Sequence, residues 1–220
     1  MGTVVDDRGG VRRATADVLG RRGDERAADD VATRSAERLV SLLDEVSAGT
    51  RPWSSHRDLR RVAVRETVAA AGLEALSPAE EDELSGVVHR FDAWPDSATA
   101  LDRLRTRVVV AALSNADPAE IAGFSARGGL AWHLALSTRP SRAYKPDARA
   151  YAVAVEALEV DPTEIMMVAA HVWDLRAAAR TGMRTCFVRR PAEEPADEGE
   201  FELQVDDLHG LADALGAEAR

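Results

Sequence analysis

The sequence has one cysteine, few aromatic residues and no long apolar segment, and these scarcities exclude several classes of protein. Cys186 is the only cysteine among 220 residues, so the chain cannot form a disulfide framework or a cysteine-based metal site. It lies in the apolar run TCFV, where a buried small side chain is expected rather than a nucleophile. No apolar stretch is as long as a membrane span and the acidic N-terminus lacks a signal-peptide pattern, so we expect a cytoplasmic protein.

An excess of positive charge is also absent. The formal net charge of −10 argues against a nucleic-acid partner, although a few local cations could still bind a small anionic substrate. The arginine pairs Arg12–Arg13, Arg21–Arg22 and Arg60–Arg61 alternate with acids, so we expect them on solvated helix faces. With 45% hydrophobic and 30% charged residues, the composition is that of a folded globular chain, long enough for one domain with an inserted cap.

The first half of the chain has a helical pattern. From Val11 to about His89, apolar residues recur at spacings of three and four, and Ser77–Leu84 combines an N-cap serine with an acidic first turn. Gly49–Trp53 and Gly72–Ser77 break the pattern into separate helices. We therefore expect no strand in this half.

The pattern changes at Ala93–Ser97, after which short β-branched apolar runs alternate with helical segments. The expected strands are Val108–Leu113, Ile165–Ala170 and Thr185–Val188, and the expected helices are Ser97–Thr106, Asp147–Glu159 and Asp174–Thr181, the last closed by Gly182. This alternation predicts a doubly wound α/β sheet, with the helical first half as a cap over the carboxyl ends of the strands. The acidic segment Pro191–Glu200 is expected to be a mobile loop.

Polar residues follow the expected strands at the sheet edge where ligands bind. Ser114 and Asn115 follow the first run and could bind an anion, although a plain turn explains them better when they are taken alone. Lys145 precedes a proline that restricts its backbone, and Asp174 starts a helix, where it could simply be a capping residue. Their joint order at one sheet edge is what favours a functional site.

That order resembles the haloacid dehalogenase superfamily, and the segments LSNADPAEI, AYKPDARAY and MMVAAHVWDLRAAARTGMRT are similar to the type II (S)-2-haloacid dehalogenases. The resemblance implies a Rossmann-like core of residues 1–8 and 96–220 with a parallel sheet, and an inserted helical cap of residues 9–95. In the family, the first strand ends in Asp-x-x-Gly-Thr, of which this chain has Gly2–Thr3. We therefore expect the first central strand and its nucleophilic aspartate to precede Met1, owing to a misassigned start codon or a clipped sequence.

The implied activity is displacement of halide from C2 of a short (S)-2-haloalkanoic acid by the upstream carboxylate, followed by hydrolysis of the ester to the (R)-2-hydroxy acid. Thr3 would orient the nucleophile and Lys145 would keep it ionised. Ser114 would bind the substrate carboxylate, and Asn115 would receive the halide together with a cap arginine. Asp6 and Asp7 are not expected to replace the nucleophile, because Asp6 matches a residue the family already has beyond the turn.

The remaining implied site residues follow from the same resemblance. Asp174 would position Lys145 and the hydrolytic water, and Tyr151 would line the pocket. The match in the cap is too loose to choose between Arg34 and Arg38 as the halide-side arginine. His171 stands where the family has the asparagine of Ser-x-Asn, so it either contributes to water positioning or is a core-edge histidine bonded to backbone.

The resemblance implies no metal and no cofactor, because the segment AAHVWD carries only one carboxylate, too few for the Mg²⁺ site of related phosphatases. The implied partner is a small 2-haloacid, and a homodimer is the assembly common in the family. Two alternatives stay open. One is a catalytically inactive relative that binds small carboxylates or a protein, and the other, disfavoured by the acid count, is a phosphatase.

Overall fold

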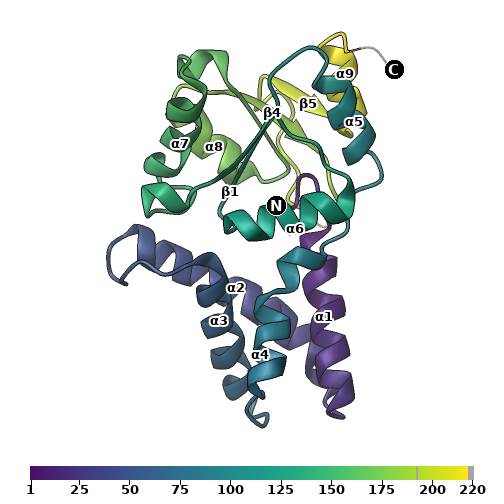
Figure 1. Ribbon diagram of the computed structural model, residues 1–220, viewed down its shortest axis with the longest axis vertical. Coiled ribbons are helices and arrows are strands. Elements are labelled where there is room, and N and C mark those ends of the chain that lie inside the picture. The colour runs from purple at the N-terminus through teal and green to yellow at the C-terminus, as the bar shows by residue number, and fades with distance from the viewer. Residues whose placement is uncertain (192, 218–220) are drawn as a thin grey trace.

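The computed structural model describes residues 1–191 and 193–217, which form a helical part and an α/β part (Figure 1). The helical part contains α1 (Asp7–Arg21), η1 (Glu25–Ala27), α2 (Ala28–Ser47), α3 (His56–Ala70), α4 (Pro78–Ser85) and η2 (Val87–Arg90). The helix predicted at Ser77 is confirmed, since Ser77 and Glu80 form a reciprocal capping box at the start of α4. Among the described residues, no helix has the length and apolar character needed to cross a membrane.

The second half contains the predicted alternation of strands and helices. Its elements are α5 (Ser97–Leu104), β1 (Ala111–Ser114), α6 (Pro118–Gly128), β2 (Leu134–Ser137), η3 (Arg139–Ser141), α7 (Ala148–Leu158), η4 (Pro162–Glu164), β3 (Met166–Ala169), α8 (Val172–Arg180), β4 (Arg184–Val188), β5 (Leu203–Val205) and α9 (Leu208–Ala214). The three predicted strands are confirmed with shifted ends. The sequence analysis missed β2, β5, α6 and α9. The two strands are short and lie at sheet edges, so no long apolar run marks them in the sequence.

All strand pairs are parallel, in the order β1-β2 in one sheet and β3-β4-β5 in another. Helices α7 and α8 lie on one side of the strands and α5 and α9 on the other (Figure 1). Both sheets share these layers, since Leu113 of β1 and Met167 of β3 pack against the same cluster from α7 and α8. This is the expected doubly wound α/β architecture. The expectation of a further central strand concerns residues outside this sequence, and it stays a prediction, as do the exact core and cap boundaries.

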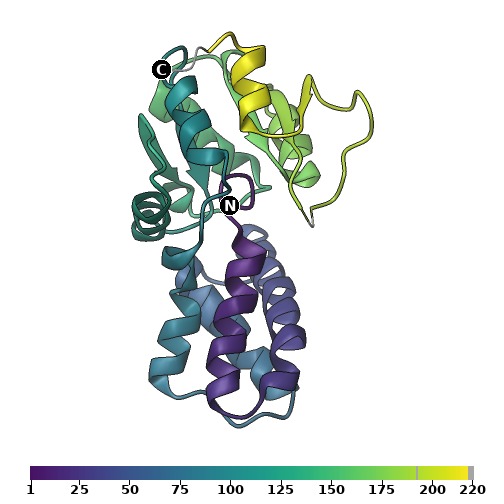
Figure 2. The same ribbon diagram turned by 90° about the vertical axis from the view of Figure 1, so that its right-hand side faces the viewer.

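The N-terminal residues lie between the two parts of the molecule (Figure 2). Val5 forms an isolated antiparallel bridge with Ala93, and the indole Nε1 of Trp94 donates to the carbonyl of Gly2 over 2.7 Å. These contacts fix the first residues next to the linker that enters α5.

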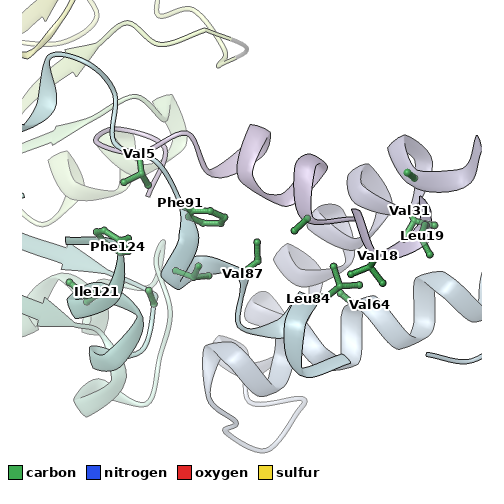
Figure 3. Packing of buried hydrophobic residues seen from close by; sticks show 14 of the residues in the cluster. Val5, Val18, Leu19, Val31, Val64, Leu84, Val87, Phe91, Ile121 and Phe124 are labelled. Atoms are coloured by element: carbon green, nitrogen blue, oxygen red, sulfur yellow. The ribbon is translucent and has the colours of Figure 1, made fainter. Parts of the chain in front are cut away.

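One apolar cluster joins the two parts. Val5, Phe91, Ile121 and Phe124 lie at its α/β end and pack through Val87 toward α1, α2 and α3, as Figure 3 shows. Phe91, Val5 and Ile121 have no exposed surface. Because burying such a side chain stabilises a fold by roughly 1.5–3 kcal/mol, the two parts are expected to unfold together.

A buried ion pair anchors the N-terminal segment to the α/β part. Arg190 donates through two nitrogens to the two carboxylate oxygens of Asp96 over 2.9 Å each, and its Nε donates to the carbonyl of Thr3 over 2.8 Å. The Asp96 carboxylate also accepts from the backbone N–H of Leu208 at the start of α9. Each nitrogen of the guanidinium and each oxygen of the carboxylate therefore has a partner.

Replacing Asp96 with alanine should lower the free energy of unfolding by about 3–5 kcal/mol, because Arg190 would keep a buried charge without its partner. Chemical denaturation followed by circular dichroism measures this change. Asp102→Ala on the same helix is the control, since the Asp102 side chain is 63% exposed and forms only a surface pair. Equal effects of the two substitutions would contradict the role assigned to Asp96.

Candidate active site

A buried group of Lys145, Asp174 and Tyr151 lies at the carboxyl-end edge of the strands. The Nζ atom of Lys145 donates to Asp174 Oδ2 over 3.1 Å, and the Tyr151 hydroxyl donates to Asp174 Oδ1 over 2.6 Å. The Lys145 and Asp174 side chains are only 5% and 8% exposed, and Tyr151 is fully buried. The structure thus brings together three residues that lie apart in the sequence.

The charges of this group shift the pKa values of Asp174 and Tyr151 in opposite directions. Burial would raise the pKa of Asp174, but the Lys145 charge and the hydrogen bonds from Tyr151 and Lys145 outweigh it, so the pKa lies below its usual value. Burial, together with the Asp174 charge, raises the pKa of the Tyr151 hydroxyl. Asp174 is therefore ionised and Tyr151 is a neutral donor, which leaves Lys145 as a fixed cation.

Asn115 positions the backbone of Lys145. Its Oδ1 accepts from the Lys145 N–H over 2.9 Å and its Nδ2 lies 3.3 Å from the Lys145 carbonyl. On the other side, the hydroxyl of Tyr144 donates to the carbonyl of Ser54, in the loop before α3, over 2.6 Å. The lysine is thereby held between the end of β1 and the helical part. The expected role of Asn115 toward a halide stays a prediction.

Ser114 and Thr3 also lie at this edge. The Ser114 hydroxyl accepts from the N–H of Ala116 over 3.1 Å, which is the local turn that the sequence left open as an alternative. The Thr3 hydroxyl accepts from the N–H of Ala170, just after β3, over 3.1 Å. Thr3 is thus fixed next to the strand that leads to His171 and Asp174.

The imidazole of His171, at the N-cap of α8, faces acids rather than backbone. Its Nε2 lies 3.7 Å from Glu193 Oε2. A Cβ on Gly2 would come 3.1 Å from Glu193 Oε1 and 3.2 Å from both Asp7 Oδ1 and His171 Cε1, so a glycine allows these side chains to converge. Burial lowers the pKa of His171 to about 4, so the ring is neutral at pH 7. Glu193 was missed because no local sequence pattern marks it.

The structure leaves Arg34 and Arg38 outside this group. Arg34 pairs with Asp30 one turn earlier on α2 over 3.0 Å, and its side chain is 57% exposed. Arg38 pairs with Glu45 over 2.7 Å and with Glu66 of α3. Acids within the helical part therefore bind both arginines, and neither contacts the Lys145 group among the described residues.

The burial of Arg60 contradicts the expectation from the sequence. It was expected on a solvated helix face with Arg61, but it is 7% exposed, near the buried pair of His56 and Glu120. The sequence could not reveal this position, because the pattern of α3 does not tell which arginine faces another part of the chain.

The arrangement offers a buried cation, an ionised acid and a neutral imidazole around the first residues of the chain. A fixed cation of this kind can hold a nearby carboxylate in its ionised form and offset developing negative charge. Within residues 1–191 and 193–217, no three or more His, Cys, Asp or Glu side chains gather in a way that could hold a metal ion.

Comparison with known proteins assigns this architecture to a family. The family model described as haloacid dehalogenase-like hydrolase matches residues 1–182. The (S)-2-haloacid dehalogenase 4A of Burkholderia cepacia is 31% identical over 135 residues, which cover 60% of this chain and 58% of that protein. An (S)-2-haloacid dehalogenase of Pseudomonas sp. (strain YL) is 34% identical over 102 residues, 46% of this chain and 43% of that protein. The chain thus matches about half the length of these curated relatives.

Solved structures extend the likeness to nearly the whole chain. A defluorinating L-2-haloacid dehalogenase has a TM-score of 0.91 and 30% identity, covering 98% of this chain and 92% of that one. Another L-2-haloacid dehalogenase has a TM-score of 0.89 and 29% identity, covering 99% and 96%.

The buried His171 should make stability depend on pH. Between its folded pKa of about 4 and the ordinary value of 6.5, the unfolded chain binds more protons than the folded one. The free energy of unfolding should therefore fall as the pH drops from about 6.5 toward 4, by at most about 1.4 kcal/mol per pH unit from this group. Denaturation across this range measures the slope, which His171→Asn should flatten. An unchanged slope in this variant would contradict the assignment.

Proposed function

The chain belongs to the haloacid dehalogenase-like hydrolase family, and on that premise we propose that it hydrolyses short (S)-2-haloalkanoic acids to (R)-2-hydroxy acids. The names of its relatives support the substrate class. The observation that carries the proposal is the buried Lys145–Asp174 pair at the sheet edge, held by Tyr151 and Asn115. A fixed cation at this place is suited to a reaction in which a carboxylate attacks and an anion departs.

The proposed reaction has two steps. A carboxylate oxygen forms a bond to C2 of the substrate while the carbon–halogen bond breaks, and the halide leaves with the bonding electrons, which inverts C2. Water then adds to the carbonyl carbon of the resulting ester, and cleavage of the acyl–oxygen bond releases the hydroxy acid and restores the carboxylate. The water transfers one proton to the departing alkoxide, and its remaining proton is released to solvent.

Lys145 would keep the attacking carboxylate ionised and offset negative charge as the halide leaves. Thr3, fixed to the end of β3, would orient that carboxylate. The Ser114 hydroxyl, at the end of β1, would bind the substrate carboxylate. Asn115, which accepts from the backbone N–H of Lys145, would also bind the departing halide.

Asp174 and His171 would serve the hydrolytic step. Asp174 holds the Lys145 ammonium and accepts from Tyr151, and it would orient the water through its remaining acceptor capacity. The neutral imidazole of His171, next to Glu193, could accept a proton from that water. A cytoplasmic location and a homodimer belong to the same proposal.

Chloride release from the two enantiomers of 2-chloropropionate, without added metal, tests the function. The assay compares the 220-residue chain with a version extended at its N-terminus by the residues that in-frame upstream codons encode. Chloride release from the S enantiomer by the extended protein is the expected result. A folded extended protein that carries the aspartate and releases no chloride would favour the inactive, carboxylate-binding relative, and activity that requires Mg²⁺ with a phosphate ester would favour a phosphatase.

Lys145→Met should lower kcat for chloride release by about 10²–10³-fold, because the cation that stabilises the departing charge is lost. Arg149→Met is the matched control, since Arg149 lies on the neighbouring α7 with a 56% exposed side chain and pairs with Asp147. Circular dichroism verifies that both variants fold. Equal activity of the two variants would exclude Lys145 from the chemistry.

A further inference from the structure

A cavity of about 590 Å³ lies between the loop that precedes α3 and the edge strand β2. Trp53 of that loop, Arg139 and Arg142 line it together with an apolar wall, and Lys145 is not among its lining residues. Its volume falls in the range of roughly 300–1,000 Å³ that is typical of small-molecule sites. The cavity is therefore large enough for a small ligand and is distinct from the candidate active site.

Both arginines of the cavity lie over the ring of Trp53. The Cζ atoms of Arg139 and Arg142 are 5.4 and 5.2 Å from the ring centroid, within the range of a cation–π contact. The N–H groups of a guanidinium lie in its own plane, so a guanidinium that rests on a ring keeps them free to donate to an oxyanion. Trp53 thus holds two anion-binding groups in the wall of one cavity.

The charges of the two arginines are only partly neutralised. Arg139 Nη1 lies 3.5 Å from Asp117 Oδ1, and Asp117 also accepts from the backbone N–H of Arg57. Among the described residues, the Arg142 side chain contacts the Trp53 ring and forms no ion pair. Two guanidinium groups less one carboxylate leave one positive charge at the cavity, although the chain as a whole carries −10. This local charge matches that of a monovalent anion.

Two features of the lining are unfavourable for folding. Arg142 has a φ of 50°, in the left-handed region that residues with a Cβ rarely adopt. The indole Nε1 of Trp53 is buried without a hydrogen-bond partner, whereas those of Trp94 and Trp132 donate to the Gly2 carbonyl and the Ser125 hydroxyl. Because both features fall on residues that line the same cavity, they favour a role of these residues in binding over one in stability.

The rest of the lining decides between a bare anion and one with an apolar body. Leu136 of β2, Pro140 of η3 and Val153 of α7 line the cavity beside the arginines. Chloride or acetate would leave this wall in contact with water, whereas a ligand with an aromatic body would cover it. The arginines and the wall together therefore fit an aromatic carboxylate.

We propose that the cavity lined by Trp53, Arg139 and Arg142 is a binding site for a small aromatic monocarboxylate. The carboxylate accepts from the two guanidinium groups, and the aromatic body packs against Leu136 and Val153. The site joins the loop before α3 to the residues that follow β2, so an occupied site also holds the helical part against the α/β part. The proposal does not depend on the dehalogenation proposed above.

Calorimetric titration of the 220-residue chain with 2-naphthoate at constant ionic strength tests the proposal. Wild type should bind the probe, and Arg142→Met should weaken binding by about 10- to 100-fold, because a hydrogen bond to a charged group is lost. Arg189→Met is the matched control, since the Arg189 side chain is 65% exposed, pairs with Asp206 and does not line the cavity. Absence of binding in wild type, or equal affinity in the two variants, overturns the proposal.

Three further probes separate the contributions of charge and apolar body. Naphthalene-2-methanol lacks the charge, acetate lacks the aromatic body, and 2-naphthyl phosphate carries a second negative charge, so each should bind more weakly than 2-naphthoate. Equal affinity for the alcohol would reduce the site to an apolar surface. Equal affinity for acetate would remove the role of the wall, and tighter binding of the phosphate would refute the choice of a monocarboxylate.

A second comparison places the bound probe in the molecule. Lys145→Met, verified to fold by circular dichroism, should bind 2-naphthoate with the affinity of wild type. In wild type, the indole Nε1–H resonance of Trp53, assigned from its absence in Trp53→Phe, should shift as the probe is added. Binding that is lost in Lys145→Met and retained in Arg142→Met, or an unmoved Trp53 resonance, would place the probe in the candidate active site and refute the separate site.

Discussion

The buried ion pair between Lys145 and Asp174 is the interaction on which the site depends. Two charges away from water are stable only when their remaining hydrogen-bonding capacity is satisfied. Tyr151 satisfies the second oxygen of Asp174, and Asn115 fixes the backbone that carries the lysine. The residues of this site come from the end of β1, the start of α8 and the interior of α7, so the charges meet only when these elements are packed together.

The helical part contributes to the same site through the junction that it shares with the α/β part. Tyr144, the residue before Lys145, donates to a carbonyl in the loop that leads into α3. The apolar cluster around Phe91 and Ile121 also packs the helical part against the α/β part (Figure 3). Movement of α3 away from α6 would therefore disturb both the support of the lysine and the position of Arg60.

The arginines show how similar residues acquire different roles through their surroundings. Arg34 and Arg38 are bound by acids of the helical part, and Arg190 is buried with hydrogen bonds to Asp96 and to the carbonyl of Thr3. Arg60 alone among these four is buried without a hydrogen bond to the described residues. Sequence periodicity cannot distinguish them, because the difference depends on which helix faces which neighbour.

The sequence by itself determined the helical first half, three of the strands and the order of the chemical groups at the sheet edge. These features are local, since apolar periodicity and capping residues act within a few turns of chain. The tertiary structure alone decided that Tyr151 donates to Asp174, that His171 faces Glu193, and that Arg60 is buried whereas Arg34 is exposed. These contacts join segments far apart in the chain, and only packing of the helices against the sheets brings such segments together.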